Sequence, residues 1–285
     1  MVAKATKAMS PEWGAQSWFF YFFRKGETEL KFFKLAFLII ALTGSMASPS
    51  WSHFGMLIPS DSMVMQDDNR TVTVSLSFSH PFEMVGMDLV KPKIFNVLAG
   101  GKHKDLLDSL NTTRVMGHQA WKTAYPIKRP GVYMFYMEPA PFWEAAEDSF
   151  IIHYTKTVVA AFGDDEGWDE VLGLKAEIVP LSKPFGLYAG NVFQGIVKLD
   201  GKAVPLAQVE VEYFNEDKKY TAPTDYMITQ SIKADSNGVF TYAAPVPGWW
   251  GFAALISADY KLPHQGIEKD VELGAVIWVY FNEMK

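Results

Sequence analysis

The feature that most constrains the fold of this chain is a series of segments in which apolar and polar residues alternate with a period of two. The clearest is residues 71–78, TVTVSLSF. Such alternation is typical of a β-strand with one buried and one solvated face. Further strand candidates are 132–137, 150–159, 192–199, 209–214, 238–243 and 275–281. The pattern therefore predicts β structure throughout the region after the N-terminal segment.

Turn-forming dipeptides separate these candidates. Asp200-Gly201 and Asn237-Gly238 stand between apolar runs, where such pairs indicate tight hairpins. Short strands at this spacing predict antiparallel β-sandwiches. A cluster of Pro180, Pro184 and Gly186 indicates a boundary, after which the strand pattern restarts. We expect an all-β protein with two Ig-like or transthyretin-like sandwich domains, residues 53–182 and 183–285.

The N-terminal segment, residues 1–52, has the pattern of an extension followed by an export signal. An apolar run, LAFLIIAL at 35–42, follows Lys31 and Lys34, and small residues come next. A cut between Ser52 and His53 would make His53 the first residue of the mature protein. The alternative cut after Ala47 leaves His53 in a short N-terminal arm. An uncleaved membrane anchor is a second alternative, although a spanning helix needs about 20 apolar residues.

Charge and composition exclude several classes of protein. The first 52 residues carry six basic and three acidic residues, so 20 basic and 29 acidic ones remain, a formal net charge of −9. This balance argues against a nucleic-acid partner, because phosphate binding needs clustered Lys and Arg. The chain has no cysteine, so disulfides and thiolate metal sites are excluded. Enzyme motifs such as Gly-x-Ser-x-Gly and His-Glu-x-x-His are also missing, and we expect no catalytic activity.

The histidines are concentrated in the first predicted domain. Histidine is the commonest protein ligand of transition metals, so a metal site is expected there. A mature N-terminal His53 would offer a free amine and an imidazole, which titrate near pH 8 and 6.5 respectively. His80 continues the inward parity of the strand 71–78 and precedes Pro81, which ends the strand. His118 fits a ligand or a core position equally well. His153 shares a strand face with Ile151 and is favoured as a structural residue.

The remaining candidates have simpler interpretations. His103 and His264 lie in segments that predict solvated turns. Met84 and Met87 would supply thioether sulfur to a soft metal such as Cu(I), although methionines more often fill irregular cores. The acidic stretch 164–170 lacks the spacing of a calcium-binding loop, which favours a solvated loop over a weak cation or docking surface.

Two parts of the sequence resemble known protein families. Residues 195–211 with 234–242, which contain the Asp-Gly turn and Asp-Ser-Asn-Gly-Val-Phe, resemble the carboxypeptidase-regulatory sandwich module. The segments HFGMLIPS at 53–60, SHPFEMVGMDLVKP at 79–92, VMGHQAW at 115–121 and the stretch from Tyr136 to Glu144 resemble the extracytoplasmic nickel-uptake family. Its members are exported accessory proteins of energy-coupling-factor-type nickel transporters.

The second resemblance implies a function. The protein would capture Ni(II) outside the cytoplasmic membrane, in the periplasm or an equivalent compartment, and pass it to integral membrane transporter subunits. We expect His53, through its amine and ring, to bind the metal with His80 and His118. His153, Met84 and Met87 are weaker candidates.

Two alternatives stay open. One is a copper protein, either a periplasmic carrier or a monooxygenase with an N-terminal histidine. The other is a metal-free sandwich that serves in adhesion or glycan binding.

Overall fold

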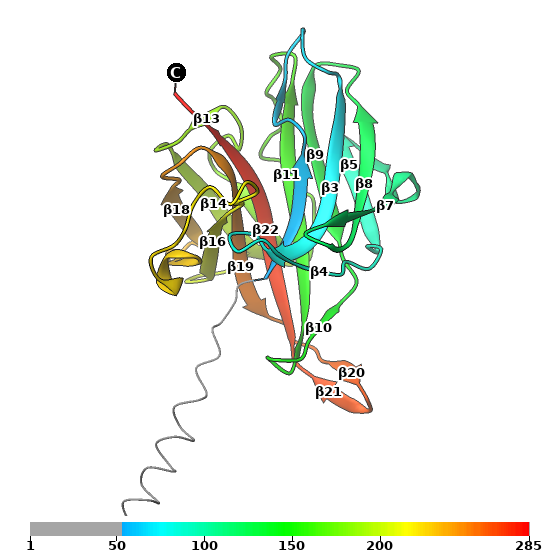
Figure 1. Cartoon of the computed structure of the whole chain (residues 1–285), viewed down its shortest axis with the longest axis vertical. Helices are drawn as coiled ribbons and strands as arrows, with labels where there is room; N and C mark the ends of the chain where they lie inside the picture. Colours follow the sequence, from blue (N-terminus) through cyan, green and yellow to red (C-terminus); the bar gives the residue numbers. More distant parts are fainter. Residues whose placement is uncertain (1–52, 285) are drawn as a thin grey trace, which may run out of the picture. The chain divides into compact units, whose positions relative to one another are not determined.

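The computed structural model describes residues 53–284, which form an all-β structure (Figure 1). The predicted leader lies outside the described residues. Within them, the helical elements are two 3₁₀ turns, η1 (Leu107–Ser109) and η2 (Asp225–Met227). No helix in this part of the chain is long and apolar enough to cross a membrane.

The first sheet has five antiparallel strands in the order β1-β3-β8-β7, with β4 paired to the end of β3. The alternating segment predicted from the sequence forms β3, where Val72, Val74 and Leu76 are buried while Thr71 and Thr73 face solvent. The strands are β1 (Phe54–Pro59), β3 (Thr71–His80), β4 (Val85–Met87), β7 (Asn111–Val115) and β8 (His118–Pro126).

The second and longest sheet contains 11 strands, with a main path in the order β17-β16-β19-β22-β11-β9-β5-β6. The path strands are β5 (Ile94–Ala99), β6 (Lys102–Asp105), β9 (Gly131–Glu138), β11 (Ser149–Ala161), β16 (Gln208–Tyr213), β17 (Gln230–Lys233), β19 (Gly248–Ser257) and β22 (Val271–Asn282). Short strands that pair at its sides are β2 (Met63–Val64), β10 (Phe142–Glu144) and β13 (Leu187–Tyr188).

The long sheet joins the two halves of the chain through a parallel ladder. β11 and β22 pair from Phe150↔Val271 to Thr157↔Trp278. In Figure 1, β22 accordingly runs between the strands of the first half and those of the second. The predicted division into domains at 182/183 stays a prediction, but backbone hydrogen bonds of the sheet cross it.

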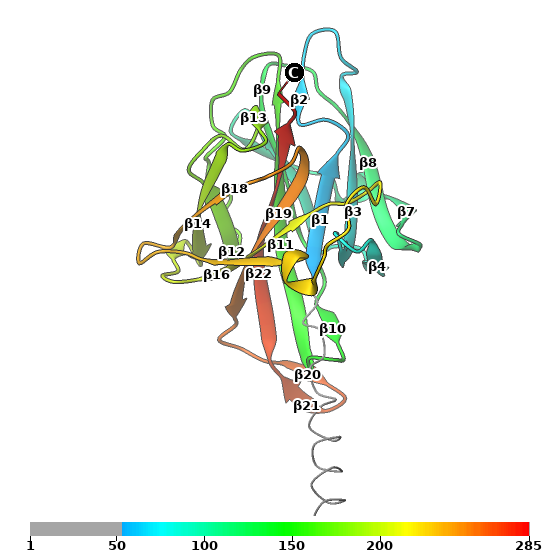
Figure 2. The same cartoon turned by 60° about the vertical axis from the view of Figure 1, so that its left-hand side comes forward.

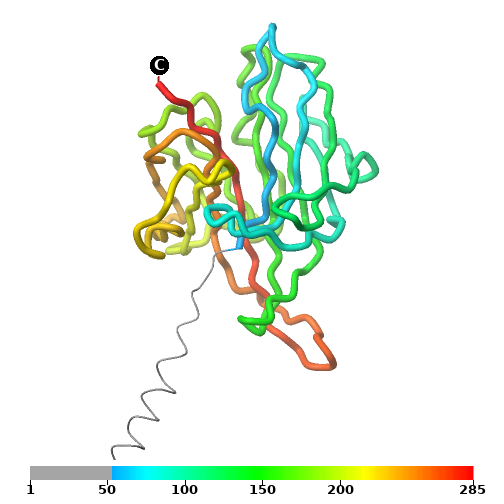
Figure 3. The backbone as a smooth tube through the Cα atoms, in the orientation of Figure 1, coloured from blue at the N-terminus to red at the C-terminus, as the bar shows by residue number. Residues whose placement is uncertain are grey.

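A third sheet covers the second half of the long sheet. Its strands are β12 (Ala176–Pro180), β14 (Val192–Leu199), β15 (Lys202–Ala203) and β18 (Val239–Ala243), and β14 coincides with a predicted strand. A small hairpin, β20 (Leu262–His264) with β21 (Ile267–Lys269), completes the fold at one end (Figure 3).

The three sheets enclose separate apolar cores on opposite faces of the long sheet. Alternate residues of β11 divide between them: Ile151 packs with Leu76 and Phe135 under the first sheet, whereas Ile152 packs with Phe193 under the third. Burial of apolar area on both faces stabilises the arrangement by roughly 25 cal/mol per Å². The predicted all-β sandwich architecture is confirmed, and each sandwich shares the long sheet as one of its layers.

Candidate metal site

The register of β1 against β3 brings His53 next to His80. Phe54 at the start of β1 pairs with Ser79 near the end of β3, so the residue before Phe54 lies across from His80. The two imidazole rings have centroids 4.6 Å apart, with their planes inclined at 53°. Figure 2 shows β1 beside β3, over the long sheet.

Both rings are withdrawn from solvent. His80 is buried, in a stretch of β3 where Ser77 and Ser79 of the opposite parity are buried too, and the His53 side chain is 9% exposed. The His53 ring also lies against Phe78, with centroids 5.6 Å apart. Apolar surroundings of this kind disfavour a charged imidazole.

Glu144 is the third polar group at this site, and sequence reasoning missed it. Its Oε2 lies 2.9 Å from His53 Nε2, and its side chain is 17% exposed. Strand β10 holds the carboxylate there by pairing with β11, where Glu144 stands opposite Ser149. Glu144 stands at the end of a segment that carries the family resemblance, but that position does not indicate a contact with His53.

Burial controls the charge of His53. Burial and, after it, the neighbouring His80 lower the pKa of the ring to about 4, while Glu144 acts in the opposite direction. His53 is therefore neutral at pH 7, with one ring nitrogen free of a proton. A neutral imidazole is the form that binds a metal.

His153 lies under β1 and serves as a link between strands. The Gly55 N–H donates to its Nδ1 at 3.2 Å, so the proton of the neutral ring resides on Nε2. That Nε2 has no hydrogen-bond partner and lies 3.7 Å from Glu272 Oε1. The ring is 1% exposed. This hydrogen bond ties the ring to the β1 backbone, and the structural role favoured from the sequence stays a prediction.

The other predicted ligands lie in different surroundings. The His118 side chain is 46% exposed, and its Nδ1 lies 3.4 Å from Asp88 Oδ1. Met84 packs on the cluster of Phe54, Met56 and Trp278. Met87 packs on the apolar core under the first sheet. The structure thus brings together His53 and His80 of the predicted set and places His118 beside Asp88.

The two histidines predicted as solvated turn residues both contact aromatic rings. His103 Nδ1 lies 2.7 Å from the Tyr136 hydroxyl. His264 stacks on Trp143, with centroids 3.8 Å apart. These contacts are with Tyr136 and Trp143, and neither involves His53 or His80.

Within residues 53–284, no group of three or more His, Asp or Glu side chains is arranged to hold a metal ion. Side chains alone therefore supply two imidazoles and one hydrogen-bonded carboxylate.

A family model described as a domain of unknown function, DUF4198, matches residues 50–258. The chain belongs to this family. The region shared with the DUF4198 family begins just before His53 and includes His80, Glu144 and His153. Among curated proteins, no sequence matches the chain.

This DUF4198 protein is similar to several solved structures at low sequence identity. The D0-D1 domain of Intimin is 12% identical, with 81% of this chain and 100% of that chain covered, at a TM-score of 0.22. The adhesin InvE of Yersinia pseudotuberculosis is 10% identical over 80% of this chain and 61% of that chain, at 0.23. A putative carbohydrate binding protein from Bacteroides uniformis is 12% identical over 78% and 97%, at 0.23. The fold assignment rests on the strand pairing described above.

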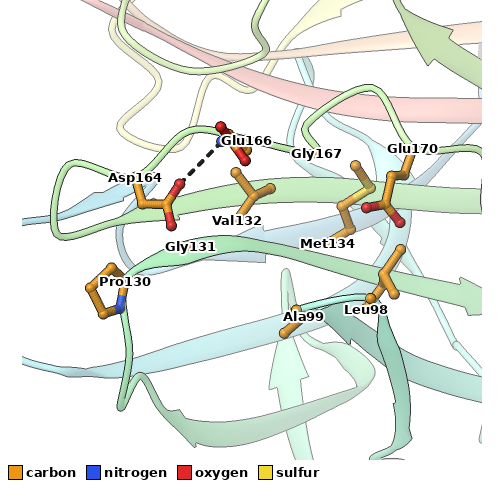
Figure 4. Close-up of a pocket in the computed structure, with 12 residues that line it drawn as sticks. Leu98, Ala99, Pro130, Gly131, Val132, Met134, Asp164, Glu166, Gly167 and Glu170 are labelled. Atoms are coloured by element: carbon orange, nitrogen blue, oxygen red, sulfur yellow. Dashed lines mark hydrogen bonds between the residues drawn. The ribbon is translucent and has the colours of Figure 1, made fainter.

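Two pockets of the DUF4198 protein lie near residues discussed above. One, of about 280 Å³, lies beside the candidate site and is lined by Phe78, Phe142, Trp143 and His153 among others. The other, of about 360 Å³, contains three carboxylates of the acidic stretch predicted as a solvated loop, Asp164, Glu166 and Glu170 (Figure 4). There the Glu166 N–H donates to Asp164 Oδ1 at 3.3 Å.

Proposed function

We propose that the mature protein captures Ni(II) outside the cytoplasmic membrane and delivers it to a membrane transporter. The observation that carries the proposal is the pair of neighbouring, buried imidazoles of His53 and His80 at the point where the predicted leader ends. The family resemblance noted in the sequence supports the choice of metal and partner.

The proposed ligands are the amine and ring of His53 and the ring of His80. Amine and imidazole nitrogens suit Ni(II). His118 is left out of this set because it pairs with Asp88. In the precursor the nitrogen of His53 is a peptide amide, which donates a hydrogen bond but is not a metal ligand at neutral pH. Metal capture would therefore begin only after export and cleavage.

Three protein ligands leave coordination positions of the metal open. Water would fill them in the carrier, and a donor from the transporter would replace water during transfer. Structural metal sites are closed by protein ligands, whereas an open position lets a ligand from outside the protein bind. The partly enclosed site would thus hold the ion without sealing it.

The test is Ni(II) binding by isothermal calorimetry to protein that begins at His53, beside a variant with one alanine added before His53. We expect one ion per chain, and an affinity for the extended variant lower by at least about tenfold, or ~1.4 kcal/mol. Intact mass of the exported protein reports the natural cleavage point and the bound metal.

A matched control separates the site from histidines in general. His80→Ala should weaken Ni(II) binding, whereas His264→Ala removes an imidazole that stacks on Trp143 and should not. Absence of saturable binding, or equal affinity of the extended variant, would contradict the proposal.

A second candidate cargo is Cu(II), which the same three nitrogen donors favour because it stands above Ni(II) in the Irving–Williams order. Competition between the two ions for the protein that begins at His53 measures the preference. Turnover with oxygen and a reductant would instead indicate a copper enzyme.

A further inference from the structure

The carboxylate of Glu144 is fixed at both of its oxygens. Oε1 accepts a hydrogen bond from the Ala146 N–H at 2.9 Å, within the turn that follows β10. Oε2 faces His53 Nε2 at 2.9 Å. The hydrogen bond from the turn therefore restrains the Glu144 side chain so that its other oxygen faces the His53 ring.

This contact determines which nitrogen of the His53 ring carries the proton. A carboxylate accepts hydrogen bonds, so Nε2 must be protonated to donate one. In a neutral ring the lone pair then resides on Nδ1. Nδ1 is the ring nitrogen nearer the backbone, and it is the one that can close a chelate ring together with the α-amine of the same residue.

We propose that Glu144 is the positioning residue of the metal site: by accepting the Nε2 proton of His53 it leaves Nδ1 free to chelate the metal with the amine. This inference rests on the proposed function. Histidine ligands commonly donate their second nitrogen to a carboxylate, which orients the ring and raises its basicity. Glu144 supplies that partner from a strand 91 positions further along the chain.

Two substitutions separate the hydrogen bond from the charge. Glu144→Ala removes both, whereas Glu144→Gln keeps an oxygen that accepts the Nε2 proton. Glu147→Ala is a matched control, since it removes a negative charge from the same turn but not the atom that contacts His53. The charges of Glu144 and Glu147 influence each other, so the control tests a general electrostatic effect.

The first measurement is the tautomer of His53 in metal-free protein that begins at His53, from the ¹⁵N shifts of the ring. We expect the Nε2–H form in the unsubstituted protein, Glu144→Gln and Glu147→Ala, and a mixture of both forms in Glu144→Ala. Thermal unfolding of each variant confirms that it is folded. An unchanged tautomer in folded Glu144→Ala would overturn the proposal.

The second measurement is the Ni(II) dissociation constant of the same four proteins. Loss of such a partner should weaken binding by about 10- to 100-fold in Glu144→Ala, with recovery in Glu144→Gln. An equal loss in Glu147→Ala would show that charge alone matters and would overturn the proposal. If the unsubstituted protein binds no Ni(II), the proposed function fails, whereas the tautomer measurement still decides the role of Glu144.

Discussion

At the scale of single residues, burial determines the charge of a second group that supports the candidate site. Glu212 lies beneath the loop after His80, where its carboxyl group accepts hydrogen bonds from the Phe82 N–H and the Thr229 hydroxyl. The Asn215 N–H donates to the Pro81 carbonyl in the same place. Burial raises the pKa of Glu212 to about 8. The neutral acid is therefore part of the folded structure at pH 7.

This raised pKa predicts a loss of stability as the pH rises. Between pH 4.5 and about 8 the folded state holds a proton on Glu212 that the unfolded state releases, so the free energy of unfolding falls across that window. The effect should be on the order of a few kcal/mol. Glu212→Gln mimics the protonated acid and should remove most of this pH dependence in urea unfolding measured at pH 5 and pH 8. Exposed Glu216→Gln is the control, and an equal effect there would contradict the assignment.

Residues of the candidate site differ in how far the sequence could predict them. His80 was accessible because the sequence predicts both its strand and the end of that strand at Pro81. Its proximity to His53 follows once the hairpin-like register of β1 and β3 is known. Glu144 was not accessible, because its contact with His53 depends on the pairing of β10 with β11. No local pattern encodes a contact over that distance.

At the scale of elements, β1 lies close to the long sheet because two glycines and one histidine fit together. A Cβ at Gly55 would lie 2.4 Å from Thr155 Oγ1 and 3.0 Å from the Cβ of His153. A Cβ at Gly274 on β22 would lie 2.3 Å from Cδ2 of the same His153 ring. The absence of side chains at these positions lets the ring bridge β11, β22 and the backbone of β1.

This packing predicts non-additive effects of two substitutions. Gly274→Ala should destabilise the protein by about 1–3 kcal/mol through overpacking, and His153→Ala by about 2–4 kcal/mol through the cavity it leaves. In the double variant the alanine methyl enters the space of the ring, so the loss should be smaller than the sum by about 1 kcal/mol or more. Denaturant unfolding measures all three variants.

The control for this cycle is Gly195→Ala combined with His153→Ala. Gly195 is also closely packed, against Ile178 and Phe240 in the core that the third sheet covers. Its effect should add to that of His153→Ala, because the two sites share no partners. Additivity in the Gly274 cycle as well would show that the ring does not fill the space above Gly274.

Strands, like single residues, differ in how far the sequence could predict them. Strands with a regular period or a long apolar run, such as β3, β11 and β22, could be predicted to within a few residues. β1, with the sequence FGMLIP, could not, because both of its faces are buried and the period disappears. The parallel pairing of β11 with β22 was also missed, since pairing over more than 100 residues leaves no local signal.

At the scale of the whole described chain, contacts between the long sheet and the third sheet are extensive and partly polar. Lys156 on β11 forms a buried ion pair with Glu177 on β12, with Nζ and Oε1 2.7 Å apart. Burial lowers the pKa of Lys156, and Glu177 opposes that effect. Glu177 also accepts the backbone N–H groups of Leu172 and Gly173. Breaking such a pair would leave a buried charge, so the long sheet and the third sheet are costly to separate.

The last prediction is that residues 53–285 unfold as one cooperative unit. Ile152, Tyr154 and Val158 of β11 pack into the core that the third sheet covers, so a fragment of residues 53–182 would expose them. It would also lose the β22 partner of β11. Calorimetry of residues 53–285 should show one transition with equal calorimetric and van't Hoff enthalpies, and the fragment should show no cooperative transition. Two transitions, one of them reproduced by the fragment, would establish independent domains with their boundary near residue 182.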